Sequence, residues 1–227
     1  MASSTEMCAP QEVTIRSGRV RLEGHLGIPL SPLAIVVFAH GSGSGRFSPR
    51  NNYVARHLQQ GRMATLLIDL LTSDEAEDRR KVFDIDLLAD RVLLAKAWIE
   101  QDDRTKGLGI GYFGASTGAG AALQAAARDP SSIRAVVSRG GRPDLAEAYL
   151  PSVTAPTLLI VGGDDEPVIE MNRTAYRLLS CPKRLVIVPG ASHLFEEPGT
   201  LEQVAEHALI WLQQHVHPGP QTKERLR

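Results

Sequence analysis

The segment 109–120 constrains the fold of this chain more than any other, because it joins a short apolar run to an alanine-rich run through the pentapeptide Gly-Ala-Ser-Thr-Gly. We interpret it as a strand, a sharp turn and a helix, with Ser116 at the apex. So tight a turn needs residues without a side chain two positions to either side, and Gly114 and Gly118 meet that need. It exposes the serine hydroxyl and directs the Thr117 N–H toward the place where an oxyanion forms. The pentapeptide alone is equally compatible with an ordinary helix N-terminus packed on a sheet.

The rest of the chain repeats the same strand-then-helix unit. Residues 12–29 alternate apolar and polar side chains around Ser17-Gly18, which predicts an antiparallel hairpin. A continuous apolar run, typical of a strand buried on both faces, occupies residues 34–39, and further strands are expected at residues 63–70, 133–138, 156–161 and 184–188, besides the one that precedes Ser116. These patterns predict an α/β protein with a mostly parallel central sheet, an N-terminal antiparallel hairpin and helices on both faces.

Helix boundaries are marked by capping residues. Ser48 as N-cap and Pro49 as first helical residue predict a helix that Gly61 ends. Asp84 is expected to cap the helix that follows the charged stretch 73–81. The last helix is expected to open with a capping box, Thr200-x-x-Gln203.

The length of 227 residues, of which 43% are hydrophobic and 22% charged, suits one globular domain. We expect that domain at residues 12–216, between flexible tails at 1–11 and 217–227. Only residues 139–155 separate the fourth parallel strand from the fifth, which is too short for a helical cap, so we expect an open site.

Two further strand ends carry residues that a serine nucleophile requires. Asp165 follows the strand that ends at residue 161, and His193 follows the strand that ends at residue 188. A serine hydroxyl needs a base within hydrogen-bond reach, and the base needs a carboxylate that fixes its tautomer. Because the carboxyl ends of parallel strands share one edge of the sheet, Ser116, Asp165 and His193 are expected to converge. Asp164 is the alternative carboxylate, but it is expected to lie within the turn itself.

The glycine-rich turn after the first parallel strand supplies the other expected part of an oxyanion hole. The N–H of Ser42 is the expected donor beside that of Thr117, with Gly41 or Gly43 as alternatives. His40 is expected to order this turn by hydrogen bonding, and is also a candidate for binding substrate.

These motifs together resemble the α/β-hydrolase family, within it the small, capless branch similar to dienelactone hydrolases. The resemblance covers nearly the whole chain, and the motifs that carry it are His40-Gly41-Ser42-Gly43-Ser44-Gly45 with Ser48-Pro49-Arg50-Asn51, Gly114-Ala115-Ser116-Thr117-Gly118, Gly162-x-x-Asp165-x-x-Val168 and Gly190-Ala191-x-His193-x-Phe195. It implies that Ser116 is the nucleophile, His193 the base and Asp165 the acid that orients it. True dienelactone hydrolases carry cysteine at the elbow, so serine favours ordinary carboxylic esters over dienelactone.

The expected function is therefore a serine carboxylesterase that cleaves small esters through an acyl-enzyme. Acyl transfer, thioester hydrolysis and lactone hydrolysis would use the same residues. Three arginines stand near the expected site and are candidates for binding a substrate carboxylate, although solvated rim positions are the more ordinary reading: Arg139, Arg142 and Arg46.

Charge and cysteine content exclude other classes of function. A net charge of −1 and a pI near 6.7 offer no footprint for nucleic acid or an anionic membrane. No leader or membrane span is recognised, so a cytoplasmic protein is expected. Cys8 and Cys181 are too few for a disulfide framework and are expected to be free thiols. We expect no metal and no cofactor, small esters and water as the only partners, and either a monomer or a homodimer.

Two readings from other classes remain open. Gly109-x-Gly111-x-x-Gly114 matches the dinucleotide-binding fingerprint as a string, but these glycines fall inside the expected strand and not after it. A noncatalytic protein with the hydrolase fold is the other reading; such a protein need not keep all three members of the triad, and this chain has them.

Overall fold

The computed structural model describes residues 10–216. The strands are β1 (Gln11–Ser17), β2 (Val20–Gly27), β3 (Ala34–Ala39), β4 (Met63–Ile68), β5 (Gly109–Ala115), β6 (Ile133–Arg139), β7 (Thr157–Gly162) and β8 (Lys183–Val188). The helices are α1 (Pro49–Gln60), α2 (Ser73–Ala76), α3 (Arg79–Val82), α4 (Ile85–Gln101), α5 (Thr117–Arg128), the 3₁₀ helix η1 (Pro143–Ser152), α6 (Glu166–Leu178) and α7 (Thr200–His215).

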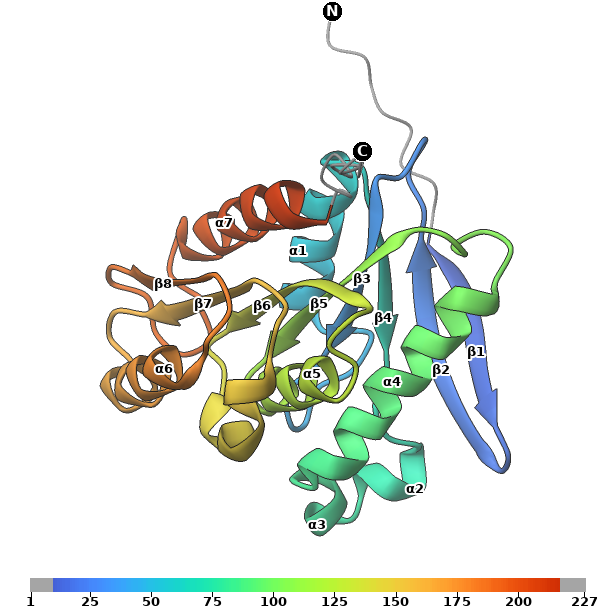
Figure 1. Ribbon diagram of the computed structural model, residues 1–227, viewed down its shortest axis with the longest axis horizontal. Coiled ribbons are helices and arrows are strands. Elements are labelled where there is room, and N and C mark those ends of the chain that lie inside the picture. Colours follow the sequence, from blue (N-terminus) through green and yellow to red (C-terminus); the bar gives the residue numbers. More distant parts are fainter. Residues whose placement is uncertain (1–9, 217–227) are drawn as a thin grey trace, which may run out of the picture.

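All eight strands form one sheet in the order β1-β2-β4-β3-β5-β6-β7-β8 (Figure 1). The β1–β2 hairpin adds to β4 in antiparallel fashion, and the strands from β4 to β8 are parallel to one another. This order places β5, which carries the serine turn at its end, in the middle of the sheet. The predicted fold class is confirmed, and so is the hairpin around Ser17-Gly18.

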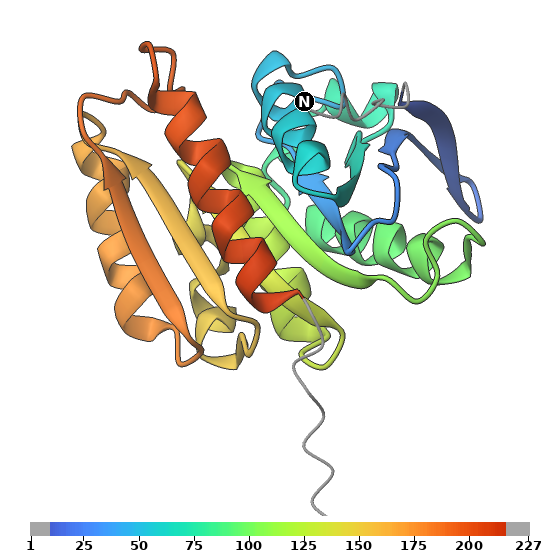
Figure 2. The same cartoon turned by 90° about the horizontal axis from the view of Figure 1, so that it is seen from above.

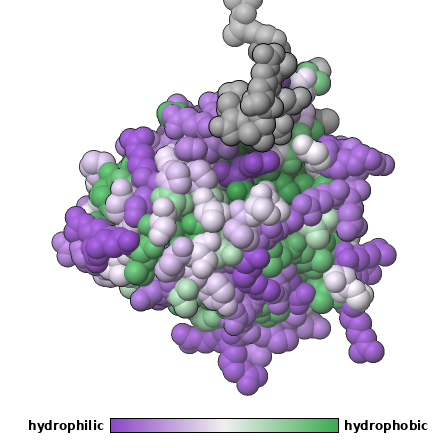
Figure 3. All heavy atoms as spheres, viewed as in Figure 1, coloured by the Kyte–Doolittle hydropathy of each residue, from purple (hydrophilic) through white to green (hydrophobic). Residues whose placement is uncertain are grey.

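Helices cover both faces of the sheet, and each face has its own apolar core. Helices α1 and α7 lie side by side on one face, which Figure 2 shows from above. Helices α4, α5 and α6 pack on the other face together with η1. Strands β3 to β7 are therefore buried on both sides, which is why their sequences are nearly continuous apolar runs. On the outside, hydrophilic side chains break up the apolar areas of the face in Figure 3.

The expected caps of α1 and α4 are confirmed, and that of α7 is wrong. The Ser48 hydroxyl accepts the N–H of Asn51, and the Asp84 carboxylate accepts that of Leu87. In α7 the N-cap is Gly199 with a φ of 80°, and no side chain caps the helix. Thr200 is already helical, and its hydroxyl donates to the Glu197 carbonyl, so the predicted capping box does not form.

Two connections contain more structure than the sequence patterns predict. The charged stretch after β4 folds into α2 and α3, and Thr72 and Glu75 form a capping box at its start. The connection after β6 forms η1, which packs against α5 and α6 but is no cap domain. The predicted tails fall mostly on residues 1–9 and 217–227, outside the described residues, while β1 begins at Gln11.

Helix α5 approaches the sheet so closely that glycine is required at the contact. A side chain at Gly118 would run into the backbone carbonyls of Ala39 and His40. A side chain at Gly114 would lie 2.7 Å from the Gly118 carbonyl oxygen and 2.8 Å from the Ala119 nitrogen. Since backbone atoms cannot move aside as a side chain can, both positions are closed to larger residues.

We predict that Gly118→Ala lowers the free energy of unfolding by about 3 kcal/mol or more, because the overlap is with buried backbone. Gly190→Ala is the matched control: Gly190 has a φ of 66° and nothing within 4 Å of an added side chain, so that variant should lose only about 1–2 kcal/mol. Urea unfolding measures both. Equal losses would contradict the packing argument.

Candidate active site

Ser116 occupies a strained turn that the surrounding backbone holds in place. It has φ 50° and ψ −123°, a left-handed conformation that is unfavourable for a residue with a side chain. Its N–H donates to the Arg139 carbonyl (3.2 Å), and its carbonyl accepts the N–H groups of Ala119 and Arg142 at 3.0 Å each. The turn is thus tied to its own helix and to the loop after β6, which keeps the hydroxyl at the end of β5.

Helix α6 holds the loop after β6 in place through hydrogen bonds. The buried side chain of Asn172 donates to the carbonyl of Gly141 at 3.0 Å and to that of Val168 at 2.8 Å. The N–H of Gly140, which has a φ of 49°, donates to Ile160 in β7. The strand-end loops beside Ser116 therefore form one hydrogen-bonded layer.

The loops after β7 and β8 bring Asp165 and His193 together. The two loops run backbone to backbone, since Gly163 N–H donates to the Val188 carbonyl and Asp164 N–H to the Ala191 carbonyl. Asp165 is the N-cap residue of α6, and its Oδ2 lies 2.7 Å from His193 Nδ1. Nδ1 is the nitrogen that donates, which leaves Nε2 of the imidazole as the free acceptor.

The same geometry separates the two adjacent carboxylates. The Asp165 side chain is only 12% exposed and contacts the imidazole, whereas Asp164 is exposed and contributes a backbone bond. The His193 ring stands next to the loop that holds Ser116, because a side chain added at Gly140 would begin 3.6 Å from His193 Cε1.

The turn after β3 crosses the serine turn at van der Waals distance. A side chain at Gly41 would lie 3.0 Å from Ser116 Cβ and 3.7 Å from its Oγ. The Ser42 N–H, the expected oxyanion donor, donates to Thr117 Oγ1 at 3.0 Å, so it is not free. To bind an oxyanion, Ser42 must share this N–H or the Thr117 hydroxyl must turn away.

His40 is used within the fold. Its Nδ1 donates to the Gly41 carbonyl (2.8 Å), and its Nε2 accepts the Leu70 N–H (2.9 Å). This pattern requires the neutral ring. Burial lowers the pKa of His40; the bond to Gly41 and the charge of Asp69 act in the opposite direction. With both nitrogens occupied, His40 orders the turn, and substrate binding through its nitrogens stays an untested prediction.

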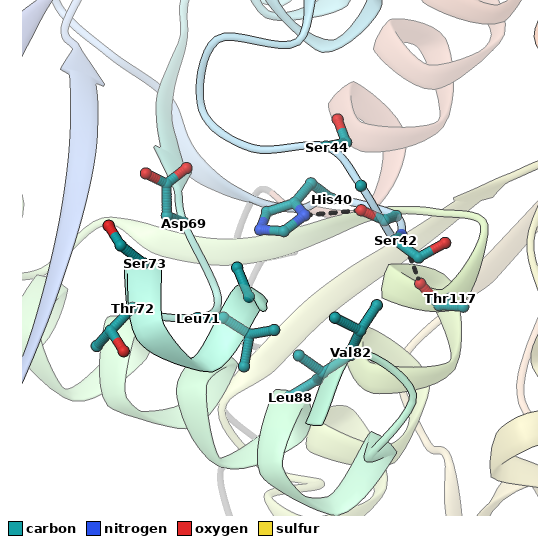
Figure 4. A pocket seen from close by; sticks show the side chains of 13 residues that line it. His40, Ser42, Ser44, Asp69, Leu71, Thr72, Ser73, Val82, Leu88 and Thr117 are labelled. Atoms are coloured by element: carbon teal, nitrogen blue, oxygen red, sulfur yellow. Dashed lines mark hydrogen bonds between the residues drawn. The ribbon is translucent and has the colours of Figure 1, made fainter. Parts of the chain in front are cut away.

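A cavity of about 360 Å³ opens on the far side of the same turn. Figure 4 shows Leu71, Val82 and Leu88 gathered on one wall, opposite His40 and Thr117. The lining residues come from the turn after β3, from the β4–α4 connection, from α4 and from α5: His40, Gly41, Ser42, Gly43, Ser44, Asp69, Leu71, Thr72, Ser73, Ala76, Val82, Leu88 and Thr117. Through Gly41 and Thr117 it adjoins Ser116.

The three candidate arginines take different positions. Arg46 binds Asp69 through both its backbone N–H and its guanidinium group. Arg142 pairs with Asp144 at 2.7 Å. Neither offers a free charge to a substrate carboxylate.

Arg139 is buried beside Phe195, with its Nη2 3.4 Å from Asn51 Oδ1. Its Nε and Nη1 have no hydrogen-bond partner among the described residues. Burial, with a smaller contribution from the charge of Arg50, lowers the pKa of Arg139 to about 10. It does not line the cavity, and its substrate-binding role stays a prediction.

Two positioning features escaped the sequence patterns. Asn172 lies on the buried face of α6 with Val168, Ile169 and Ala175. In the sequence, its role is indicated only by a polar amide at helical spacing among apolar residues. Asp69 directly follows β4, so its place at a strand end was the signal for its position at the site.

Within residues 10–216, no group of histidine, cysteine and acidic side chains has the arrangement of a metal site. No helix in that range combines the length and apolar character that a membrane crossing demands. Cys181 is a buried free thiol, as expected, and Cys8 lies outside the described residues.

Comparison with known proteins agrees with the fold. The profile of the dienelactone hydrolase family matches residues 22–215. A protein of Mycobacterium tuberculosis (strain H37Rv), provisionally named a phosphoribosyl transferase, is 56% identical over 211 residues. That match covers 92% of this chain but 48% of the relative, so the chain spans about half the length of the curated relatives that it matches.

Solved structures show the same likeness. The dienelactone hydrolase from Anabaena variabilis is 56% identical, with a TM-score of 0.88 over 92% of this chain and 100% of that one. Est1E from Butyrivibrio proteoclasticus has a TM-score of 0.78 at 17% identity, over 89% of this chain and 98% of that one, which is a likeness of fold.

The buried neutral His40 predicts acid sensitivity. The pKa of His40 in the folded protein lies below its ordinary value of 6.5, so between the two values the unfolded chain binds a proton that the folded protein does not. The free energy of unfolding should then fall as pH drops below about 6.5, by at most about 1.4 kcal/mol per pH unit from this residue. Urea unfolding between pH 7 and pH 5 measures it.

His215, whose pKa burial also lowers, adds to the wild-type slope, so the comparison with His40→Gln isolates His40. That variant should be less stable at pH 7, having lost the two bonds, and should show a shallower pH dependence. Parallel curves for the two proteins would contradict the assignment.

Proposed function

The chain belongs to the dienelactone hydrolase family, and on that premise we propose that it is a serine carboxylesterase that cleaves small esters through an acyl-enzyme. The observation that carries the proposal is the 2.7 Å bond from His193 Nδ1 to Asp165, beside a serine held in a left-handed turn. The bond leaves Nε2 as a base, and the turn presents a hydroxyl with backbone donors behind it.

In the proposed reaction Ser116 Oγ attacks the ester carbonyl carbon while His193 Nε2 takes the hydroxyl proton. His193 then gives this proton to the leaving alcohol as the C–O bond breaks, which leaves an acyl group on Ser116. Water attacks the acyl carbon next and gives a proton to His193. The bond between that carbon and Ser116 Oγ then breaks, the carboxylic acid leaves, and His193 returns the proton to Oγ. Asp165 keeps the imidazole oriented and stabilises its charged form throughout.

The oxyanion is proposed to bind at the N-terminus of α5. The N–H of Thr117 is the first donor. The N–H of Ser42 becomes the second donor when its hydrogen bond to Thr117 Oγ1 opens. Gly41 and Gly43 remain alternative donors from the same turn. A Thr117 hydroxyl that accepts from Ser42 keeps its own proton for donation, so it can serve the oxyanion as well.

Lactones, thioesters and acyl acceptors other than water would use the same residues, and rates with matched substrates distinguish these reactions. Phosphoribosyl transfer gains no support from this site. The name belongs to relatives of which this chain spans about half, and within the described residues the strand-end carboxylate Asp165 is engaged by His193.

We predict that a fluorophosphonate probe labels the wild-type protein on Ser116 and that p-nitrophenyl acetate and butyrate are hydrolysed. Ser116→Ala should lose both the label and the turnover, since it removes the proposed nucleophile. Intact-mass spectrometry and absorbance assays measure the two effects. A label that survives the substitution would refute the nucleophile.

The adjacent carboxylates allow a matched test of the acid. Asp165→Asn should lower kcat by about 10³–10⁴-fold, because an amide no longer holds the productive tautomer of His193. Asp164→Asn changes an exposed neighbour and should leave kcat within about twofold. Similar losses in the two variants, with both folded by circular dichroism, would overturn the assignment of Asp165.

A further inference from the structure

The cavity beside Ser116 shares a wall with the proposed oxyanion site. Gly41, Ser42 and Thr117 line it, and a side chain added at Gly41 would lie 3.0 Å from Ser116 Cβ. An ester carbonyl whose oxygen faces the donors of this wall has two branches, the acyl chain and the alcohol. One of these branches must lie on the cavity side of the carbonyl.

The volume and the far wall define the size and polarity of that branch. About 360 Å³ is near the lower end of the ~300–1,000 Å³ typical of small-molecule pockets. The β4–α4 connection and α4 supply an apolar wall of Leu71, Val82 and Leu88 (Figure 4). A compact aliphatic or aromatic group therefore fits.

The charges within this cavity are neutralised by the protein itself. Asp69 is the only carboxylate on the wall, and both of its oxygens bind Arg46, one through the Arg46 N–H at 2.6 Å and the other through the guanidinium. His40 is held neutral with both ring nitrogens bonded. What remains for a ligand are hydroxyl groups, such as that of Ser44, and the apolar wall.

The Arg46–Asp69 pair is also well enclosed, since the two side chains are 20% and 26% exposed. Helix α1 steadies it, because the Asn52 amide donates to the Arg46 carbonyl at 2.8 Å. A charged ligand group would lose its water in this cavity and find no free partner of opposite charge.

We propose that the cavity receives an uncharged, compact apolar branch of the ester, and that the Arg46–Asp69 ion pair makes it reject charged branches. This inference rests on the proposed esterase function of Ser116. It assigns Arg46 and Asp69 the role of specificity residues, since removing Arg46 leaves the charge of Asp69 unpaired on the cavity wall, and removing the Asp69 charge leaves that of Arg46 unpaired beside it.

Matched substrates test the proposal by charge. Tert-butyl and trimethylammonium, which have nearly the same shape, end the variable branch, and a smaller, planar carboxylate supplies the opposite charge. Each group is placed once on the acyl side of a p-nitrophenyl ester and once on the alcohol side of an acetate. In at least one series the wild type should prefer tert-butyl over both charged groups by about tenfold or more in kcat/KM.

The variants should change this preference in opposite directions. Arg46→Met frees Asp69 and should raise the trimethylammonium-to-tert-butyl ratio of kcat/KM by about tenfold. Asp69→Asn frees Arg46 and should raise the carboxylate ratio by a similar factor. The double variant carries neither charge and should return to the wild-type order, which separates a charge effect from a disturbed loop.

A size variant tests the cavity independently: Val82→Phe should lower the ratio of kcat/KM for the tert-butyl ester to that for p-nitrophenyl acetate. Ratios that stay unchanged in both series and all variants, while acetate is still hydrolysed, would overturn the inference. Failure of the esterase proposal looks different, because then neither acetate turnover nor labelling of Ser116 occurs in the wild type.

Discussion

The architecture of the site depends on holding Ser116 in a backbone conformation that a side chain disfavours. The strain persists because three backbone hydrogen bonds, from Arg139, Ala119 and Arg142, over-determine the turn. Arg139 is the last residue of β6, and Arg142 belongs to the loop that follows it, which the buried Asn172 secures in turn. The parallel sheet supplies this arrangement, since neighbouring strands end at one edge and their loops can bond to one another.

The same edge explains why residues distant in sequence share one chemistry. β7 and β8 are neighbours, so their loops align backbone to backbone and bring Asp165 onto His193. β3 lies on the other side of β5, so its turn lies against Ser116 and forms part of the cavity wall. The site thus has two sides: the His193–Asp165 pair stands toward β8, and the cavity with its internally balanced charges stands toward β4.

Sequence reasoning predicted the parts of this molecule that local pattern determines. Buried strands are visible as apolar runs, and the tight turn at Ser116 is visible in its flanking glycines. The cavity was not predictable, because its wall comes from a charged stretch whose fold depends on packing against the strand ends. The Arg46–Asp69 pair was not predictable either. It joins the loops after β3 and β4, which become neighbours only through the order of the strands in the sheet. The predicted capping box of α7 was wrong, because Gly199 is the N-cap in a left-handed conformation and the Thr200 hydroxyl donates to the Glu197 carbonyl.

The most direct test of the account is a crystal structure of the protein after reaction with a fluorophosphonate. The account predicts phosphorus bonded to Ser116 Oγ, the phosphoryl oxygen accepting the Thr117 N–H, and His193 Nε2 within hydrogen-bond distance of Ser116 Oγ while Nδ1 keeps its contact with Asp165. An adduct on another residue, or a phosphoryl oxygen turned away from the N-terminus of α5, would contradict it.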